Sequence, residues 1–219
     1  MNKNIFWDFF DNEASAKLLH REKTFRKIFE YLDKIPGPIN IIETGCVRET
    51  NNWGGDGQST ILFDNYISQR DNESICYTVD NNPRSVNACK SLVSSRVSVN
   101  LSDSVSFLSN LSKKFIEESK KVNFLYLDSY DLDMNYWYPS AAHHLKELLA
   151  IIKVLKQDTL VVVDDCPLNV NYIAGVDNHA IFISEPAVGG KGRLVAEYAI
   201  ACNAKLEFSD YQAGWTGFT

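Results

Sequence analysis

No stretch of the 219-residue sequence approaches the roughly 20 consecutive apolar residues that a membrane-spanning helix requires, so we expect no membrane partner. The N-terminal stretch MNKNIFWDFFDNEAS has acidic residues where a signal peptide would have an apolar core and a small-residue cleavage site. Internal repeats and low-complexity linkers are also lacking. These absences predict a globular protein of the cytoplasm.

An excess of basic residues is lacking as well. The sequence has 22 lysines and arginines against 28 aspartates and glutamates, which gives a formal charge of −6. A general nucleic-acid binder needs a basic face that displaces counterions, so this balance argues against a nucleic-acid partner, although it leaves room for a local basic pocket. The five cysteines are widely spaced and lack the paired spacing of a metal site, which predicts reduced thiols. A homodimer is left open.

The composition is that of a globular domain. The hydrophobic fraction is 45%, and the length suffices for one α/β domain with a substantial core but is short for two. Apolar residues recur at helical spacing from Asp11 to Ile35, and the PGP at 36–38 ends that helix. We predict an N-terminal helical segment over residues 1–37, packed on a single domain over residues 38–219.

From residue 39 onward, strand and helix signals alternate. Short apolar strands are predicted at 39–43, 74–80, 96–100, 122–128 and 158–165. Helices are predicted at 59–68, 83–94, 105–118 and 140–155, with Asn82 as the cap before Pro83. Beyond Asp165 a long excursion is predicted to hold one strand near 180–184, and a helix and two final strands follow it. This alternation predicts a parallel sheet covered by helices on both faces.

Acidic residues end four of the five predicted parallel strands. They are Glu43, Asp80, Asp128 and the pair Asp164 and Asp165. Ligands of such sheets gather at the carboxyl ends of the strands, near the switch in strand order. Chance placement of solvated acids would account for one or two of these positions, so the pattern favours a shared polar site.

The loop after the first strand, ETGCVRETNNWGGDGQST, is rich in glycine. Its GDGQST part resembles a dinucleotide fingerprint but lacks the last glycine and lies far from the strand, and the missing Gly-Lys-Ser/Thr excludes a Walker phosphate loop. Asp80 follows the glycines near the ~20-residue spacing expected of a ribose-binding acid. Together they favour a nucleoside cofactor, without separating a nicotinamide cofactor from S-adenosylmethionine.

Three carboxylates, Asp128, Asp164 and Asp165, come from the ends of neighbouring strands and could converge on one hard cation. Oxygen-only ligation suits Mg²⁺, Ca²⁺ or Mn²⁺. A cation would also make the close approach of these like charges tolerable. The alternative interpretation is that Asp164 caps a following turn and that Asp131 and Asp133 nearby face water.

With these motifs, residues 38–165 resemble the class I S-adenosylmethionine-dependent methyltransferases, and in particular the metal-dependent O-methyltransferases of the catechol and macrocin sugar types. The resemblance implies an α/β fold: a Rossmann-like, doubly wound, mostly parallel seven-stranded sheet with helices on both faces and a C-terminal antiparallel strand pair. It implies S-adenosylmethionine and a divalent cation, Mg²⁺, as cofactors.

The resemblance also carries site residues onto this sequence. It sets Glu43 and Gly45 against the methionine part of the cofactor and Asp80 on the ribose hydroxyls. Asp128, Asp164 and Asp165 match the metal-binding positions. The remaining cofactor-binding positions are Gly57, Ser59 and Thr60 in the first loop, and Asp103 and Ser104 at the adenine edge.

Methyl transfer requires an oxygen nucleophile in line with the methyl group and a group that removes its proton. In the catechol enzymes a lysine three residues after the first metal ligand is that base, and the matching position here is Asp131. We therefore name Asp128, Asp131 and His144 as catalytic residues, with His143 behind them. If the segment is helical, one of the adjacent histidines must point away from the site.

The sequence thus predicts methyl transfer from S-adenosylmethionine to a hydroxyl of a small molecule or sugar, assisted by a divalent cation. Two alternatives keep the fold: a nicotinamide-dependent oxidoreductase, which the acid pair Asp164 and Asp165 does not suit, and a non-catalytic cofactor- or partner-binding module. The GGKGR at 189–193 offers Lys191 and Arg193 to an anionic group, with a solvated turn as the alternative.

Overall fold

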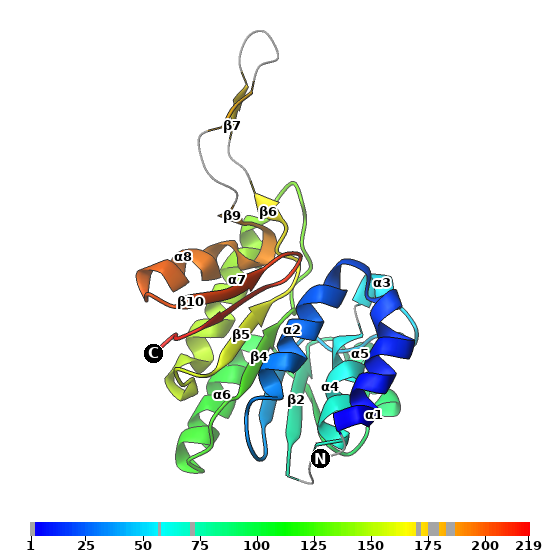
Figure 1. Cartoon of the computed structure of the whole chain (residues 1–219). Coiled ribbons are helices and arrows are strands. Elements are labelled where there is room, and N and C mark those ends of the chain that lie inside the picture. Colours follow the sequence, from blue (N-terminus) through cyan, green and yellow to red (C-terminus); the bar gives the residue numbers. More distant parts are fainter. Residues whose placement is uncertain (1–2, 57, 71–72, 170–171, 175–179, 183–186) are drawn as a thin grey trace.

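The computed structural model describes residues 3–56, 58–70, 73–169, 172–174, 180–182 and 187–219. A seven-stranded sheet with the order β10-β11-β5-β4-β1-β2-β3 runs through it (Figure 1). Strands β1 to β5 pair in parallel, and β11 is antiparallel to both β5 and β10. The strands are β1 (Asn40–Thr44), β2 (Ile75–Asp80), β3 (Val97–Leu101), β4 (Phe124–Leu127), β5 (Leu160–Val163), β10 (Lys205–Ser209) and β11 (Ala213–Thr216).

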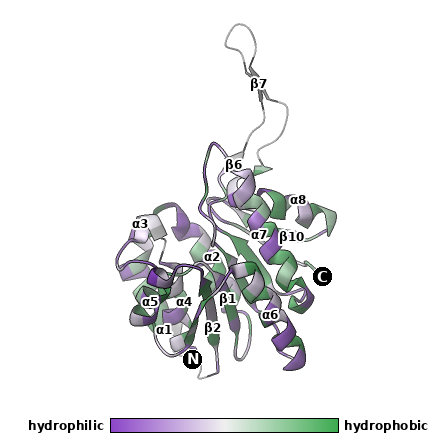
Figure 2. Cartoon of the chain, turned by 180° about the vertical axis from the view of Figure 1, so that it is seen from behind, coloured by the Kyte–Doolittle hydropathy of each residue, from purple (hydrophilic) through white to green (hydrophobic). Residues whose placement is uncertain are grey.

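Helices cover both faces of this sheet, because successive strand residues point to opposite sides. In β1, Ile41 belongs to the apolar cluster that includes α2 (Glu22–Leu32) and α4 (Ser59–Ser68). Ile42 belongs instead to the cluster that includes α6 (Ser104–Glu117), α7 (Tyr138–Ile151) and α8 (Arg193–Ala201). The strands are the hydrophobic centre between these layers (Figure 2). The predicted Rossmann-like, doubly wound fold is confirmed.

Local sequence signals explain several helix boundaries. The helix predicted at 59–68 is α4, with the same ends. Helix α5 (Pro83–Leu92) begins as predicted at Pro83, and the Asn82 side chain caps it by accepting a hydrogen bond from the Arg84 N–H. A short helix, α3 (Trp53–Asp56), lies in the glycine-rich loop. No helix in the described ranges is long and apolar enough to cross a membrane.

The single helix predicted from residue 11 to residue 35 is wrong in its first half. The structure has α1 (Lys3–Phe9), a π turn (Phe10–Ala14) and two 3₁₀ turns (Ser15–Lys17 and Leu19–Arg21) before α2 begins. The apolar residues do recur at helical spacing, but the chain is not one continuous helix, because Leu19 has a left-handed backbone with a φ of 53°. This turn redirects the chain just before Arg21, whose side chain is buried at the site described below.

In its described residues, the excursion between β5 and α8 contains two short antiparallel strand pairs. Strand β6 (Leu168–Asn169) pairs with β9 (Ala187–Val188), and β7 (Tyr172–Ala174) pairs with β8 (Ala180–Phe182). The strand predicted near 180–184 corresponds to β8, although residues 183–184 lie outside the described ranges. Figure 1 shows β7 standing away from the seven-stranded sheet.

Candidate active site

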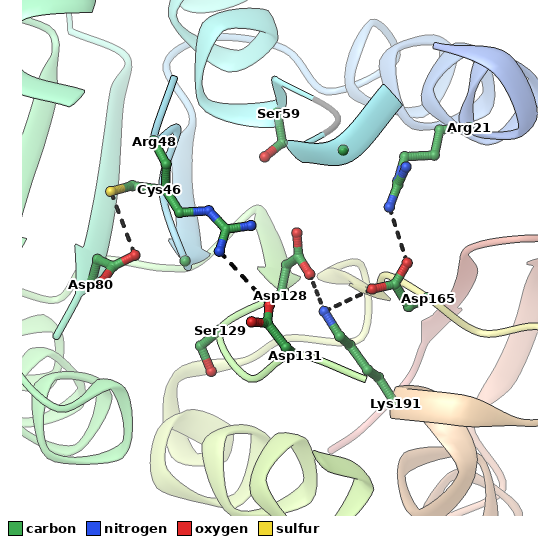
Figure 3. Close-up of a pocket in the computed structure, with 12 residues that line it drawn as sticks. Arg21, Cys46, Arg48, Ser59, Asp80, Asp128, Ser129, Asp131, Asp165 and Lys191 are labelled. Carbon is green, nitrogen blue, oxygen red and sulfur yellow. Dashed lines mark hydrogen bonds and ion pairs between the residues drawn. The ribbon is translucent and has the colours of Figure 1, made fainter. Parts of the chain in front are cut away.

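Strand order reverses between β1 and β4, and a cavity opens beyond the carboxyl ends of the strands at this point (Figure 3). It is here called the first cavity. Its lining residues are Arg21, Gly45, Cys46, Arg48, Gly55, Ser59, Asp80, Asp128, Ser129, Asp131, Asp165 and Lys191. Four carboxylates and three basic side chains give this lining a formal charge of −1.

A second cavity adjoins the first and shares Gly45, Asp80 and Ser129 with it. Its other lining residues are Val79, Asn81, Asp103, Ser104, Tyr130 and His143. We call these two adjoining cavities the bipartite space, and the residues that they share lie at the ends of β1, β2 and β4.

Gly45 allows β1 and β4 to approach each other at the junction of the two cavities. Its φ is 82°, and its N–H donates to the Val79 carbonyl over 2.9 Å. A Cβ at this position would lie 2.6 Å from the Asp128 carbonyl oxygen, closer than real Cβ contacts. Only glycine fits both the left-handed backbone and this contact.

Gly45→Ala should lower the free energy of unfolding by about 1 to 2 kcal/mol more than Gly37→Ala. Gly37 is a matched control, since its φ is 71° but a Cβ there would meet nothing within 4 Å. Both variants carry the left-handed strain, and only Gly45→Ala adds the clash with Asp128. Urea unfolding of the two variants measures the difference, and equal losses would show that the close approach has no cost.

Glu43, the penultimate residue of β1, is completely buried in a cluster of hydroxyl groups. Its Oε1 accepts from Ser59 Oγ over 2.6 Å, and its Oε2 lies 2.7 Å from both Thr60 Oγ1 and Thr78 Oγ1. Burial raises the pKa of the Glu43 carboxyl to about 7, although these hydroxyls act in the opposite direction. The cluster joins β1, β2 and the first turn of α4.

This raised pKa predicts a pH-dependent stability. The folded state favours the protonated carboxyl, so its contribution is fully present below pH 4.5 and is lost as the pH rises through about 7. As the pH rises, the free energy of unfolding of the wild type should therefore fall relative to that of Glu43→Gln, by about 3 kcal/mol at most. Denaturant unfolding from pH 4 to pH 8 tests this. A constant difference between the two proteins would contradict it.

Asp80, at the end of β2, lies where both cavities meet. Its Oδ1 accepts from the Asn82 N–H over 2.7 Å, and its Oδ2 is 3.8 Å from Cys46 Sγ. Asp103 caps α6 by accepting from the Ser106 N–H over 2.8 Å, and this bond lowers the pKa of the Asp103 carboxyl. Both acids thus present fixed carboxylates to the second cavity.

The adjacent histidines of α7 point in different directions, as the sequence predicts for a helix. His143 lines the second cavity, with Nε2 3.0 Å from Ser104 Oγ and 3.4 Å from Glu147 Oε1. The contact with Glu147 raises the pKa of His143. His144 is fully buried, its Nδ1 lies 2.7 Å from the Ser140 carbonyl, and burial lowers its pKa to about 4.

The acids after β4 and β5 form an ion-pair cluster with two basic side chains, of which Figure 3 shows Asp128, Asp165, Arg21 and Lys191. The Arg21 guanidinium donates to both oxygens of Asp164, at 3.1 and 2.9 Å, and to Asp165 Oδ1 at 3.0 Å. Lys191 Nζ contacts Asp128 Oδ1 and lies 2.9 Å from Asp165 Oδ2. We call these five residues the acid cluster.

Burial and charge act against each other in this cluster. Burial alone would lower the pKa of Lys191, but the three acids outweigh it and hold that pKa above its usual range. The same balance raises the pKa of Arg21, chiefly through Asp164. Both basic groups therefore stay charged at neutral pH.

One oxygen from each of the three acids lies within 4.8 Å of the others, a spacing that could hold a metal ion. However, those carboxylates already bind an ammonium and a guanidinium group, so a divalent cation would have to displace Lys191. As arranged here, the residues do not fit the metal that the sequence resemblance implies.

Most of the predicted site residues come together. Gly45, Ser59, Asp80, Asp103, Ser104, Asp128, Asp131 and Asp165 line the two cavities. Glu43, Thr60 and Asp164 are buried behind them, His144 is buried in α7, and Gly57 lies outside the described residues. Sequence reasoning missed Arg21, for which no local pattern gives a signal. It noted Lys191 only for an anionic ligand, whereas the structure pairs it with acids.

Comparisons with known proteins found similarity in structure only. No family model matches the chain, and no curated protein matches it by sequence. The sugar N-methyltransferase KedS8 from Streptoalloteichus sp. ATCC 53650 is 10% identical with a TM-score of 0.49, over 99% of this chain and 92% of KedS8. The DhpI complex with SAH is 7% identical with a TM-score of 0.49, over 98% and 94%. The mitomycin 7-O-methyltransferase MmcR is 12% identical with a TM-score of 0.44, over 96% and 59%.

Proposed function

We propose that the protein transfers a methyl group from S-adenosylmethionine to a hydroxyl of a small molecule or sugar. The observation that carries this proposal is the bipartite space at the strand switch, with Asp80 at its junction. A nucleoside with a charged side arm needs two such compartments and an acid between them for the ribose.

The residues present fit that cofactor. The Asp80 carboxylate can accept hydrogen bonds from two adjacent ribose hydroxyls, and the second cavity offers Asp103, Ser104 and His143 to the adenine edge. The first cavity would take the methionine part, where the net negative lining suits a sulfonium cation. When bound, S-adenosylmethionine supplies an electrophilic methyl group, and the electrons of its carbon–sulfur bond stay with sulfur.

The acceptor would enter the first cavity from the side of Asp131. This carboxylate is 87% exposed and lies 3.9 Å from the Arg48 guanidinium, so an incoming hydroxyl can reach it and lose a proton to it. His144 has no such access, since its side chain is fully buried. We therefore favour Asp131 over His144 as the proton acceptor, while Asp128 is a positioning residue through its contact with Lys191.

Calorimetry with S-adenosylmethionine, S-adenosylhomocysteine and NAD tests the proposal. We expect the first two ligands to bind and NAD not to bind. Binding of NAD without binding of S-adenosylhomocysteine would refute the methyltransferase and favour an oxidoreductase. A screen of sugars, sugar nucleotides and phenols with labelled S-adenosylmethionine would then identify the acceptor, and cofactor binding without transfer to any hydroxyl would favour a binding module.

A further inference from the structure

The acid cluster concentrates charge in the lining of the first cavity. Three carboxylates with oxygens within 4.8 Å of one another would repel strongly if nothing compensated them. Arg21 and Lys191 bring the formal charge of the cluster from −3 to −1. The chain itself therefore supplies the positive charge that a bound metal ion would otherwise supply.

Within the acid cluster, Lys191 lies between two acids that line the first cavity. Its Nζ bridges Asp128 and Asp165, the two acids of the predicted metal triad that line the first cavity. A divalent cation bound between these two carboxylates would need the same oxygens and would lie next to the ammonium charge. The lysine and the metal ion therefore exclude each other.

The backbone fixes this lysine in place. The preceding Gly190 has a φ of 53°, and a Cβ on it would collide with the Asp165 carbonyl oxygen. This close approach lets the Lys191 N–H donate to that same carbonyl over 3.1 Å, and the Gly189 N–H donates to the Pro167 carbonyl over 2.9 Å. The side chain is only 2% exposed. Lys191 is thus part of the built site and not a surface side chain folded inward.

We propose that Lys191 takes the place of a divalent cation in the acid cluster, so that the positive charge between Asp128 and Asp165 is an ammonium group of the chain. An ammonium has three N–H donors. Among the described residues, Asp128 and Asp165 account for two of them, and the third is available to a ligand oxygen in the cavity. The exclusion of metal is independent of the activity, whereas contact with an acceptor oxygen rests on the proposed function.

Titration of the metal-free protein with Mn²⁺, followed by electron paramagnetic resonance, tests the exclusion. We expect the wild type to bind Mn²⁺ at this site no more tightly than on the order of 1 mM, the weak end of oxygen-ligand sites. Lys191→Met removes the ammonium and leaves three acids with one guanidinium. Its affinity for Mn²⁺ should rise at least about tenfold, because the uncompensated carboxylates become available. Lys191→Arg, which keeps the charge, should behave like the wild type.

Substitution of Asp128 assigns the effect to the acid cluster. Asp128→Asn added to Lys191→Met should abolish the gain. A wild-type protein that binds Mn²⁺ tightly and loses it on Asp128→Asn would overturn the proposal, and so would a folded Lys191→Met variant without any gain. If Lys191→Met fails to fold, Lys191→Gln and the wild-type titration decide. Calorimetry with S-adenosylhomocysteine is run in parallel, because failure of the wild type to bind it would refute the proposed function and leave the Mn²⁺ result standing.

Discussion

Arg21→Met should lower the free energy of unfolding by about 3 to 5 kcal/mol at neutral pH, the cost of breaking a buried ion pair from one side. Arg21 is 5% exposed and Asp164 is 1% exposed, and the guanidinium contacts both oxygens of that carboxylate. Lys191 contacts Asp128 and Asp165 instead, so methionine at position 21 would leave Asp164 buried without this partner.

A surface pair provides the control for this prediction. Arg193 pairs with Glu197 at i,i+4 on α8, and Glu197 is half exposed, so Arg193→Met should cost only about 0.3 to 0.5 kcal/mol. The double variant Arg21→Met, Asp164→Leu should recover part of the loss, since an apolar pair leaves no unpaired charge. Urea unfolding of the four proteins measures these terms. A loss for Arg21→Met no larger than that for Arg193→Met would show that the buried pair adds nothing to stability.

Asp80→Ala should weaken the binding of S-adenosylhomocysteine about 10³-fold, because two hydrogen bonds to a charged acceptor are lost together. Asp80→Asn keeps the acceptor for the Asn82 N–H but removes the charge, and should weaken binding by about 10- to 100-fold. Isothermal titration calorimetry with each variant gives both constants directly.

Asp158 is the matched control for these variants. It lies just before β5, at the opposite edge of the sheet from the cavities, and pairs with Lys121 in an exposed ion pair. Asp158→Asn should leave the affinity for S-adenosylhomocysteine unchanged. If Asp80→Ala bound S-adenosylhomocysteine as tightly as the wild type, Asp80 would not be the residue that binds the ribose hydroxyls.

Local patterns predicted most of the fold. The alternation of apolar strands and amphipathic helices is a short-range property, and it placed all five parallel strands and the helix at 59–68 within a few residues. The acids that end β1, β2, β4 and β5 meet at one edge of the sheet because parallel strands all end there. For the same reason, the cavity residues Asp80, Asp128 and Asp165 could be named from the sequence.

The partners of those acids could not be predicted. Arg21 and Asp164 are 143 residues apart, and no local spacing links an N-terminal turn to the end of β5. Three clustered carboxylates indicate only that positive charge is near, and the sequence does not say whether a metal ion or a side chain supplies it. The left-handed Leu19 that directs the chain toward Arg21 is likewise invisible to a helical pattern.

The separation between Arg21 and Asp164 also sets an order for folding during synthesis. The segment over residues 3–32 leaves the ribosome before the strands of the sheet, and its phenylalanines can pack on α4 once residues 59–68 have followed. Arg21 meets its partner only after β5 has emerged, and Lys191 comes later still. The acid cluster therefore closes only after Lys191 has emerged, and a growing chain that ends before Asp164 holds the arginine without the carboxylates that receive it.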